Sequence, residues 1–106
     1  MNKILERLDL TIQGKITESP NKSHTAKLLK KGTEKCAEKF GEEAIELIVA
    51  SVKKKKKDII GEAADTLYHM LVLLRSKNIS INEVLTELAS REGISGIEEK
   101  RKRNVE

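Results

Sequence analysis

Two pairs of acidic residues at helical spacing are the strongest chemical signal in the sequence. Glu43 and Glu46 stand three positions apart in the segment GEEAIE, and Glu62 and Asp65 repeat that spacing in GEAAD. Side chains three positions apart share one face of a helix. If both segments are helical, each pair therefore presents two carboxylates in the same direction.

The surroundings of the second pair predict that a cation accompanies these carboxylates. The segment around Glu62 and Asp65 is otherwise almost wholly apolar, and burying an ionised carboxylate without a partner costs on the order of several kcal/mol. Four carboxylates held close together cannot all stay ionised without a compensating charge. An all-oxygen ligand set suits Mg²⁺ or Mn²⁺ better than Zn²⁺. We predict a metal site at Glu43, Glu46, Glu62 and Asp65, with Glu42 as a further or alternate ligand.

Such a metal site indicates phosphate chemistry. Mg²⁺ with few protein ligands completes its octahedron with water and phosphate oxygens. The sequence therefore predicts hydrolysis of a nucleotide pyrophosphate, with a general base among the four carboxylates that spacing does not identify. A second interpretation stays open, in which the same carboxylates form a structural network of ion pairs with lysines and arginines.

Hydrophobic periodicity predicts that helices position these residues, in an all-α bundle of four to five helices. The helix after the lysine run is apolar almost all round, so we expect it at the centre of the domain. It should pack antiparallel to the helix before the run, which lets the two acidic pairs converge. The predicted helices cover 3–13, a short stretch from Ser23 or Thr25 to Gly32, 33–52, 59–76 and 80–91, where Ser80 and Glu83 form a capping box.

Length and composition favour one small helical domain that associates with a copy of itself. The 106 residues suit a single domain over 1–106, with a charged tail at about 98–106 that is frayed or helical. Aromatic residues make up only 2%, so the core must be built from aliphatic side chains, as in packed helices. A large apolar central helix in so short a chain predicts a homodimer.

The charge pattern argues against nucleic acid and membrane partners. The net charge is +4, but the basic residues concentrate in Lys53–Lys57 and Lys100–Arg103, and Phe40 and Tyr68 are the only aromatic residues. No apolar stretch approaches the roughly 20 residues of a membrane span. The single cysteine, Cys36, is expected to be a small core residue, since no internal disulfide is possible. These features predict a soluble, cytoplasmic protein.

The lysine run is predicted to form the loop between the two carboxylate-bearing helices. Five adjacent ammonium groups, Lys53–Lys57, repel one another and favour water. Asp58 can then cap the helix that follows.

Several polar residues outside the acidic pairs are candidates for binding the substrate. Hydroxyl groups at a helix start lie beside free backbone N–H groups, which attract anions. Lys39 precedes Glu43 by four positions and can instead pair with that carboxylate. His69 can instead form a core pair with Tyr68, and Arg75 can reach a phosphate or face solvent. The substrate-binding candidates are Ser23, Thr25, Lys27, Lys35, Lys39, His69 and Arg91.

Three segments resemble the phosphoribosyl-ATP pyrophosphatase family, a branch of the MazG-like all-α nucleoside triphosphate pyrophosphohydrolases. They are SHTAKLLKKGTEKCAEKFGEEAIELIVA, EAADTLYHMLVLL and ELASREG. The family pattern of E-x-x-E on one helix and E-x-x-D on the next matches the two acidic pairs. His24 is a departure, because an aromatic Tyr is typical of the family between the Ser and the Thr.

This resemblance implies Mg²⁺-dependent hydrolysis of 1-(5-phosphoribosyl)-ATP to 1-(5-phosphoribosyl)-AMP and pyrophosphate. The cleaved bond would lie between the α and β phosphates, and the reaction is the second step of L-histidine biosynthesis. Two alternatives stay open. One is a housecleaning enzyme that hydrolyses ordinary or damaged nucleoside triphosphates with the same carboxylates. The other is a non-catalytic helical module whose basic tail binds an acidic partner.

Overall fold

The computed structural model describes residues 3–53 and 55–93, and these ranges contain helices and turns but no strand. None of the helices within them is both long and apolar enough to cross a membrane. The predicted tail at about 98–106 lies outside the described residues. The prediction of an all-α fold is confirmed, with the elements α1 (Ile4–Gly14), the 3₁₀ turn η1 (Lys15–Thr17), α2 (His24–Lys31), α3 (Thr33–Lys53), α4 (Lys56–Ser76) and α5 (Ile81–Ser90).

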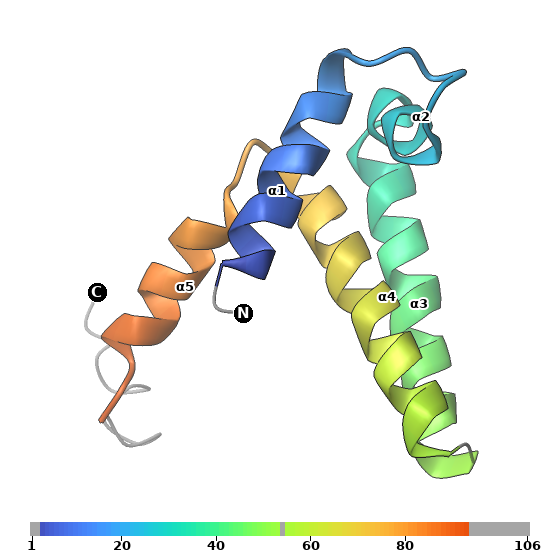
Figure 1. Cartoon of the computed structure of the whole chain (residues 1–106), viewed down its shortest axis with the longest axis vertical. Helices are drawn as coiled ribbons and strands as arrows, with labels where there is room; N and C mark the ends of the chain where they lie inside the picture. The colour runs from blue at the N-terminus through green and yellow to red at the C-terminus, as the bar shows by residue number, and fades with distance from the viewer. Residues whose placement is uncertain (1–2, 54, 94–106) are drawn as a thin grey trace.

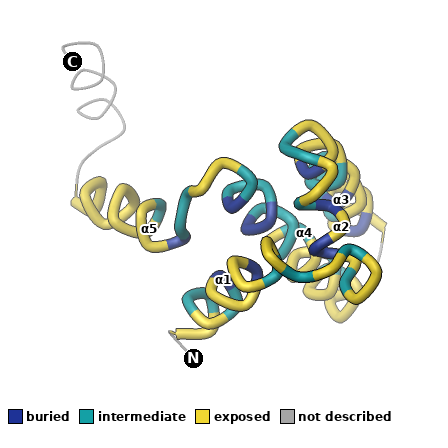
Figure 2. The backbone as a smooth tube through the Cα atoms, turned by 90° about the horizontal axis from the view of Figure 1, so that it is seen from above, coloured by how far each residue is buried: buried dark blue, intermediate teal, exposed yellow. Residues whose placement is uncertain are grey.

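The two longest helices, α3 and α4, run side by side in opposite directions and form a long hairpin (Figure 1). Helix α2 covers the end of the hairpin where α3 begins, and α1 crosses α4 near its C-terminal end. Helix α5 lies on the other side of α1 and α4 from α2 and α3, in both views (Figures 1 and 2). The hairpin therefore reaches well beyond the helices that cover it.

Helix ends follow the capping residues in two places. The Ser23 hydroxyl accepts a hydrogen bond from the Ala26 N–H at 3.1 Å, which begins α2. Ser80 and Glu83 form the predicted capping box at the start of α5. Gly32 ends α2 with φ of 100°, a backbone conformation that side-chain-bearing residues seldom adopt.

The lysine run connects the two carboxylate-bearing helices, as predicted, but the connection is shorter than the predicted loop over Lys53–Lys57. Helix α3 continues through Lys53 and α4 already begins at Lys56, with Lys55 in the N-cap position. Asp58 is not the cap but lies in the first turn of α4, where its N–H donates to the Lys55 carbonyl at 2.9 Å. At exposed helix ends lysine side chains diverge into solvent, so their repulsion does not require an extended loop.

The hydrophobic core is small and lies where α1 and α2 meet the C-terminal end of α4. Cys36 is fully buried as predicted; its thiol donates to the Leu28 carbonyl at 3.5 Å, and burial raises the pKa of that thiol. The remaining buried aliphatic side chains of this cluster are Ile12, Leu28, Leu71, Val72 and Ile81.

The prediction that α4 lies at the centre of the domain is wrong for its N-terminal half. Leu71 and Val72 are fully buried, but Ile60 is 59% and Leu67 38% exposed. The covering helices α1 and α2 reach only the C-terminal half, so α3 alone packs on the rest (Figure 1). Periodicity identified an apolar helix correctly, but within one chain that helix is only partly covered.

A buried ion pair joins three helices. The Arg75 guanidinium of α4 donates two hydrogen bonds to the Asp9 carboxylate of α1, at 2.8 and 3.0 Å. The same carboxylate accepts from the backbone N–H of Ile81, the first residue of α5, at 2.8 Å. Both charged side chains are buried, so Arg75 neither faces solvent nor is free to bind a phosphate, in contrast to the sequence-based expectation.

Candidate metal centre

Helices α3 and α4 bring three carboxylates together. One oxygen each from Glu43, Glu62 and Asp65 lies within 4.8 Å of the others. Glu43 is 8% exposed, Glu62 is half-buried and Asp65 is exposed, so the cluster runs from the hairpin interface to its surface. The antiparallel packing thus brings one residue of the first acidic pair, Glu43, together with both residues of the second pair.

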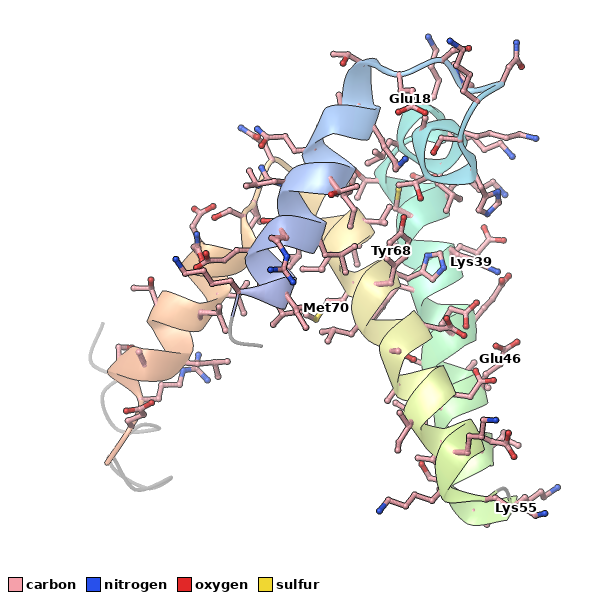
Figure 3. All side chains as sticks on the ribbon, in the orientation of Figure 1. Glu18, Lys39, Glu46, Lys55, Tyr68 and Met70 are labelled. Atoms are coloured by element: carbon pink, nitrogen blue, oxygen red, sulfur yellow. The ribbon has the colours of Figure 1, made fainter. Side chains whose placement is uncertain are left out.

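Glu46, one turn after Glu43 on α3, is not one of these three residues but lies near enough to interact with Glu43 and Glu62. A hydrogen bond to Glu43 and the negative charges of Glu43 and Glu62 raise the pKa of Glu46. The side chain projects from the same side of α3 as Lys39 (Figure 3). The carboxylates of Glu43 and Glu62 therefore disfavour the ionised form of Glu46.

Thr66 fixes the register of the two helices at the cluster. Its hydroxyl oxygen lies 2.8 Å from the Glu62 carbonyl and 3.0 Å from the Glu43 carbonyl, so it joins the backbones of the two central acidic residues. Thr66 is not among the residues predicted from the sequence. Its position four residues after Glu62 and next to Asp65 is the signal that would have found it.

The charge balance of the cluster indicates that its residues could hold a cation. The buried Oε2 atom of Glu62 has no hydrogen-bond partner, which is unusual for a carboxylate oxygen. Lys39 supplies an ammonium 3.3 Å from Glu43 Oε1, and across residues 3–53 and 55–93 no second ion pair reaches the cluster. One lysine does not balance four carboxylates, so a structural ion-pair network explains them poorly. Hard oxygen donors with spare charge fit Mg²⁺ or Mn²⁺.

The candidate residues around α2 are held mainly by contacts within the protein. The buried Thr25 hydroxyl hydrogen-bonds the Tyr68 hydroxyl, while Ser23 caps α2. The rings of Tyr68 and His69 meet edge to face with centroids 5.4 Å apart. Burial lowers the pKa of His69, and its buried Nδ1 has no hydrogen-bond partner. Thr25 and Tyr68 thus join α2 to α4.

The basic candidates lie in different places. Lys35 pairs with Glu38 at 3.3 Å on α3, and Lys27 is exposed on α2. Arg91, at the C-terminal end of α5, pairs with Glu87 at 3.1 Å. Because α5 lies across α1 and α4 from α3, a single chain does not bring Arg91 to the carboxylates (Figure 1).

Comparison with known proteins finds matches over nearly the whole chain. Residues 5–92 match the family described as phosphoribosyl-ATP pyrophosphohydrolase. A protein of Dinoroseobacter shibae named phosphoribosyl-ATP pyrophosphatase is 54% identical over 100 residues, covering 94% of this chain and 98% of the relative. A protein of that name from Paracoccus denitrificans is 54% identical over 99 residues, covering 93% and 92%. A third, from Ruegeria pomeroyi, is 53% identical over 97 residues and covers 92% of both chains. The resemblance seen in the sequence is confirmed: the chain belongs to the phosphoribosyl-ATP pyrophosphohydrolase family of hydrolases.

Proposed function

We propose that this protein hydrolyses 1-(5-phosphoribosyl)-ATP to 1-(5-phosphoribosyl)-AMP and pyrophosphate, the second step of L-histidine biosynthesis. The observation that carries the proposal is the convergence of Glu43, Glu62 and Asp65 within 4.8 Å, on the two helices of the acidic pairs. The names of relatives about half identical over nearly the whole chain support the choice of substrate.

The metal ligands in this proposal are Glu43, Glu46, Glu62 and Asp65, with Glu42 beside them on α3. The unsatisfied Glu62 Oε2 and the excess negative charge support that assignment. These residues would hold Mg²⁺, or Mn²⁺ in its place, which would supply positive charge for phosphate oxygens and lower the pKa of a water molecule. A carboxylate of the cluster that is not fully engaged accepts the proton of the attacking water as general base.

The residues around the cluster divide between binding and support. Lys35 and Lys39 on α3 are proposed to bind the phosphates. Lys39 lies beside the carboxylates, and Lys35 stands one helical turn before Lys39. Thr25 and His69 are proposed to hold neighbouring side chains in place and not to bind the phosphates. Thr25 hydrogen-bonds the Tyr68 hydroxyl, and His69 packs on the Tyr68 ring.

Pyrophosphate release from phosphoribosyl-ATP, with Mg²⁺ or with excess EDTA, tests this function. We expect release with Mg²⁺ and a fall to the background rate with EDTA, because the carboxylates alone repel the triphosphate. Deoxynucleoside triphosphates, tested in parallel, should react at least about tenfold more slowly. Equal rates would indicate a general pyrophosphohydrolase, and no Mg²⁺-dependent release from any nucleotide would indicate a non-catalytic module.

We further propose that the protein works as a homodimer that buries the free faces of the hairpin. Apolar side chains recur at positions i, i+3, i+4 and i+7 on both helices, the spacing of a stripe that packs on another helix. Most of these side chains are large, and none of them belongs to the small core. The α3 stripe consists of Ile45, Ile48, Val49 and Val52, and the α4 stripe of Ile60, Ala63, Ala64 and Leu67, all of them exposed.

Ile48→Glu is expected to weaken the dimer at least about 30-fold, since it places a charge in an apolar contact. Light scattering at micromolar concentration should show a dimer for the wild type and a smaller mass for the variant. Leu10→Glu, at an equally exposed position on α1 outside both stripes, should leave the dimer intact. A wild-type protein that stays monomeric at these concentrations would contradict the proposal.

A further inference from the structure

A basic pocket opens beside the carboxylate cluster, where α2 meets α3. It has a volume of about 200 Å³. Three of its side chains carry an ammonium and two carry a carboxylate, so its charge is positive. The lining residues are Leu28 and Lys31 from α2, and Lys35, Glu38, Lys39 and Glu42 from α3.

Lys39 belongs both to this pocket and to the carboxylate cluster. Its Nζ atom lies 3.3 Å from Glu43 Oε1 and 3.8 Å from Glu42 Oε2. The hydrogen bond to Glu43 is the main reason why the pKa of Lys39 is raised. In the structure, then, the ammonium at the boundary of the two sites is engaged with the cluster and neutralises part of its charge.

The contact between Lys39 and Glu43 is easily exchanged. The lysine side chain is a third exposed, and ion pairs of that kind contribute little to stability. Its ammonium sits on a flexible stem and can be re-aimed without moving the helix. A divalent cation bound to the Glu43 carboxylate would neutralise the negative charge of Glu43 and repel the Lys39 ammonium. Lys39 would then have to leave Glu43, and the pocket it already lines is the nearest polar space.

The pocket would gain charge from that movement. Lys31 forms no ion pair within the described part of the chain, and Lys35 pairs only with the exposed Glu38. If Lys39 turned toward Lys31 and Lys35, three ammonium groups would face the same small pocket. Such a group binds a compact, multiply charged anion and discriminates little between its oxygens.

We propose that Lys39 is an exchangeable counter-charge between the two sites. It neutralises Glu43 in the metal-free protein and, once a divalent metal ion holds that carboxylate, completes with Lys31 and Lys35 a subsite for the pyrophosphate end of the substrate. This inference rests on the proposed pyrophosphohydrolase function, because it requires a polyphosphate that extends from the cluster into the pocket. Metal and pyrophosphate then bind cooperatively, with Lys39 as the link.

Binding measurements without turnover test the exchange. Lys39→Met should bind Mn²⁺ alone about fivefold more tightly than the wild type, by electron paramagnetic resonance, since the competing ammonium is gone. With saturating Mg²⁺, calorimetry should show inorganic pyrophosphate binding at least about tenfold more weakly to this variant. Lys31→Met should weaken pyrophosphate binding and leave Mn²⁺ affinity unchanged. Lys30→Met, an exposed lysine of α2 outside the pocket, should change neither.

Two results would overturn the proposal. Unchanged or weaker Mn²⁺ binding by Lys39→Met would show that Lys39 does not compete with the metal. Unchanged pyrophosphate binding in both Lys31→Met and Lys39→Met would show that the pocket is no phosphate subsite. The expected binding pattern without any hydrolysis of phosphoribosyl-ATP would support the exchange and reject only the proposed reaction.

Discussion

Glu62→Gln is expected to lower the rate of pyrophosphate release from phosphoribosyl-ATP by about 1,000-fold. Its Oε2 atom is buried and has no hydrogen-bond partner, and it lies in the cluster with Glu43 and Asp65. The amide keeps the shape of the side chain but removes the negative charge that would bind metal. A 1,000-fold effect corresponds to about 4 kcal/mol of lost transition-state stabilisation, within what metal ions supply.

The same substitution should not destabilise the metal-free protein. Removing one of several crowded negative charges relieves repulsion, so urea unfolding in EDTA should show equal or greater stability than the wild type. Glu34→Gln, in the exposed first turn of α3, is a matched control and should keep full activity. If Glu62→Gln retained more than about a tenth of the wild-type rate, Glu62 would not be a metal ligand.

Asp9→Asn is expected to lower the free energy of unfolding by about 3 kcal/mol, because it leaves the buried Arg75 guanidinium without its counter-charge. The Asp9 carboxylate also accepts the Ile81 N–H, so α5 should lose its attachment first. Urea unfolding at one fixed protein concentration measures the loss, since the stability of the proposed dimer would depend on concentration.

Two comparisons separate this buried pair from a general effect of charge. Asp58→Asn, in the exposed first turn of α4, should lower stability by no more than about 1 kcal/mol. The double variant Asp9→Leu/Arg75→Met replaces the pair by apolar side chains and should recover much of the loss. A loss from Asp9→Asn no greater than that from Asp58→Asn would show that the ion pair is not a major source of stability.

Local chemistry explains why much of the fold could be predicted. Ser23, Ser80 and Glu83 act within one helical turn of their own positions, so their caps can be read from neighbouring residues. The three-residue spacing of the acidic pairs, together with the short connection between α3 and α4, brings Glu43 close to Glu62 and Asp65. Their role as metal ligands stays a prediction that the experiments above must test.

Features that depend on distant residues could not be predicted in the same way. Asp9 and Arg75 are 66 positions apart, and both residue types usually face solvent, so nothing in the sequence pairs them. The apolar surface of α4 indicated burial, but periodicity does not say whether the cover is the same chain or another copy. The basic pocket likewise lies where α2 meets α3. Its shape depends on the angle between these two helices, which no local sequence pattern determines.

The hydrogen bonds that Asp9 accepts also determine the order in which parts of the structure can form during synthesis. Its two partners, Arg75 and the Ile81 N–H, stand 66 and 72 positions later in the chain. The α3–α4 hairpin, by contrast, joins near neighbours in sequence and closes over a short connection. A nascent chain can therefore form the carboxylate-bearing hairpin early. The apolar side of α1 stays uncovered until almost all the described residues have been translated. Slowing translation late in the message would prolong that exposed state, when the newborn protein is most open to aggregation.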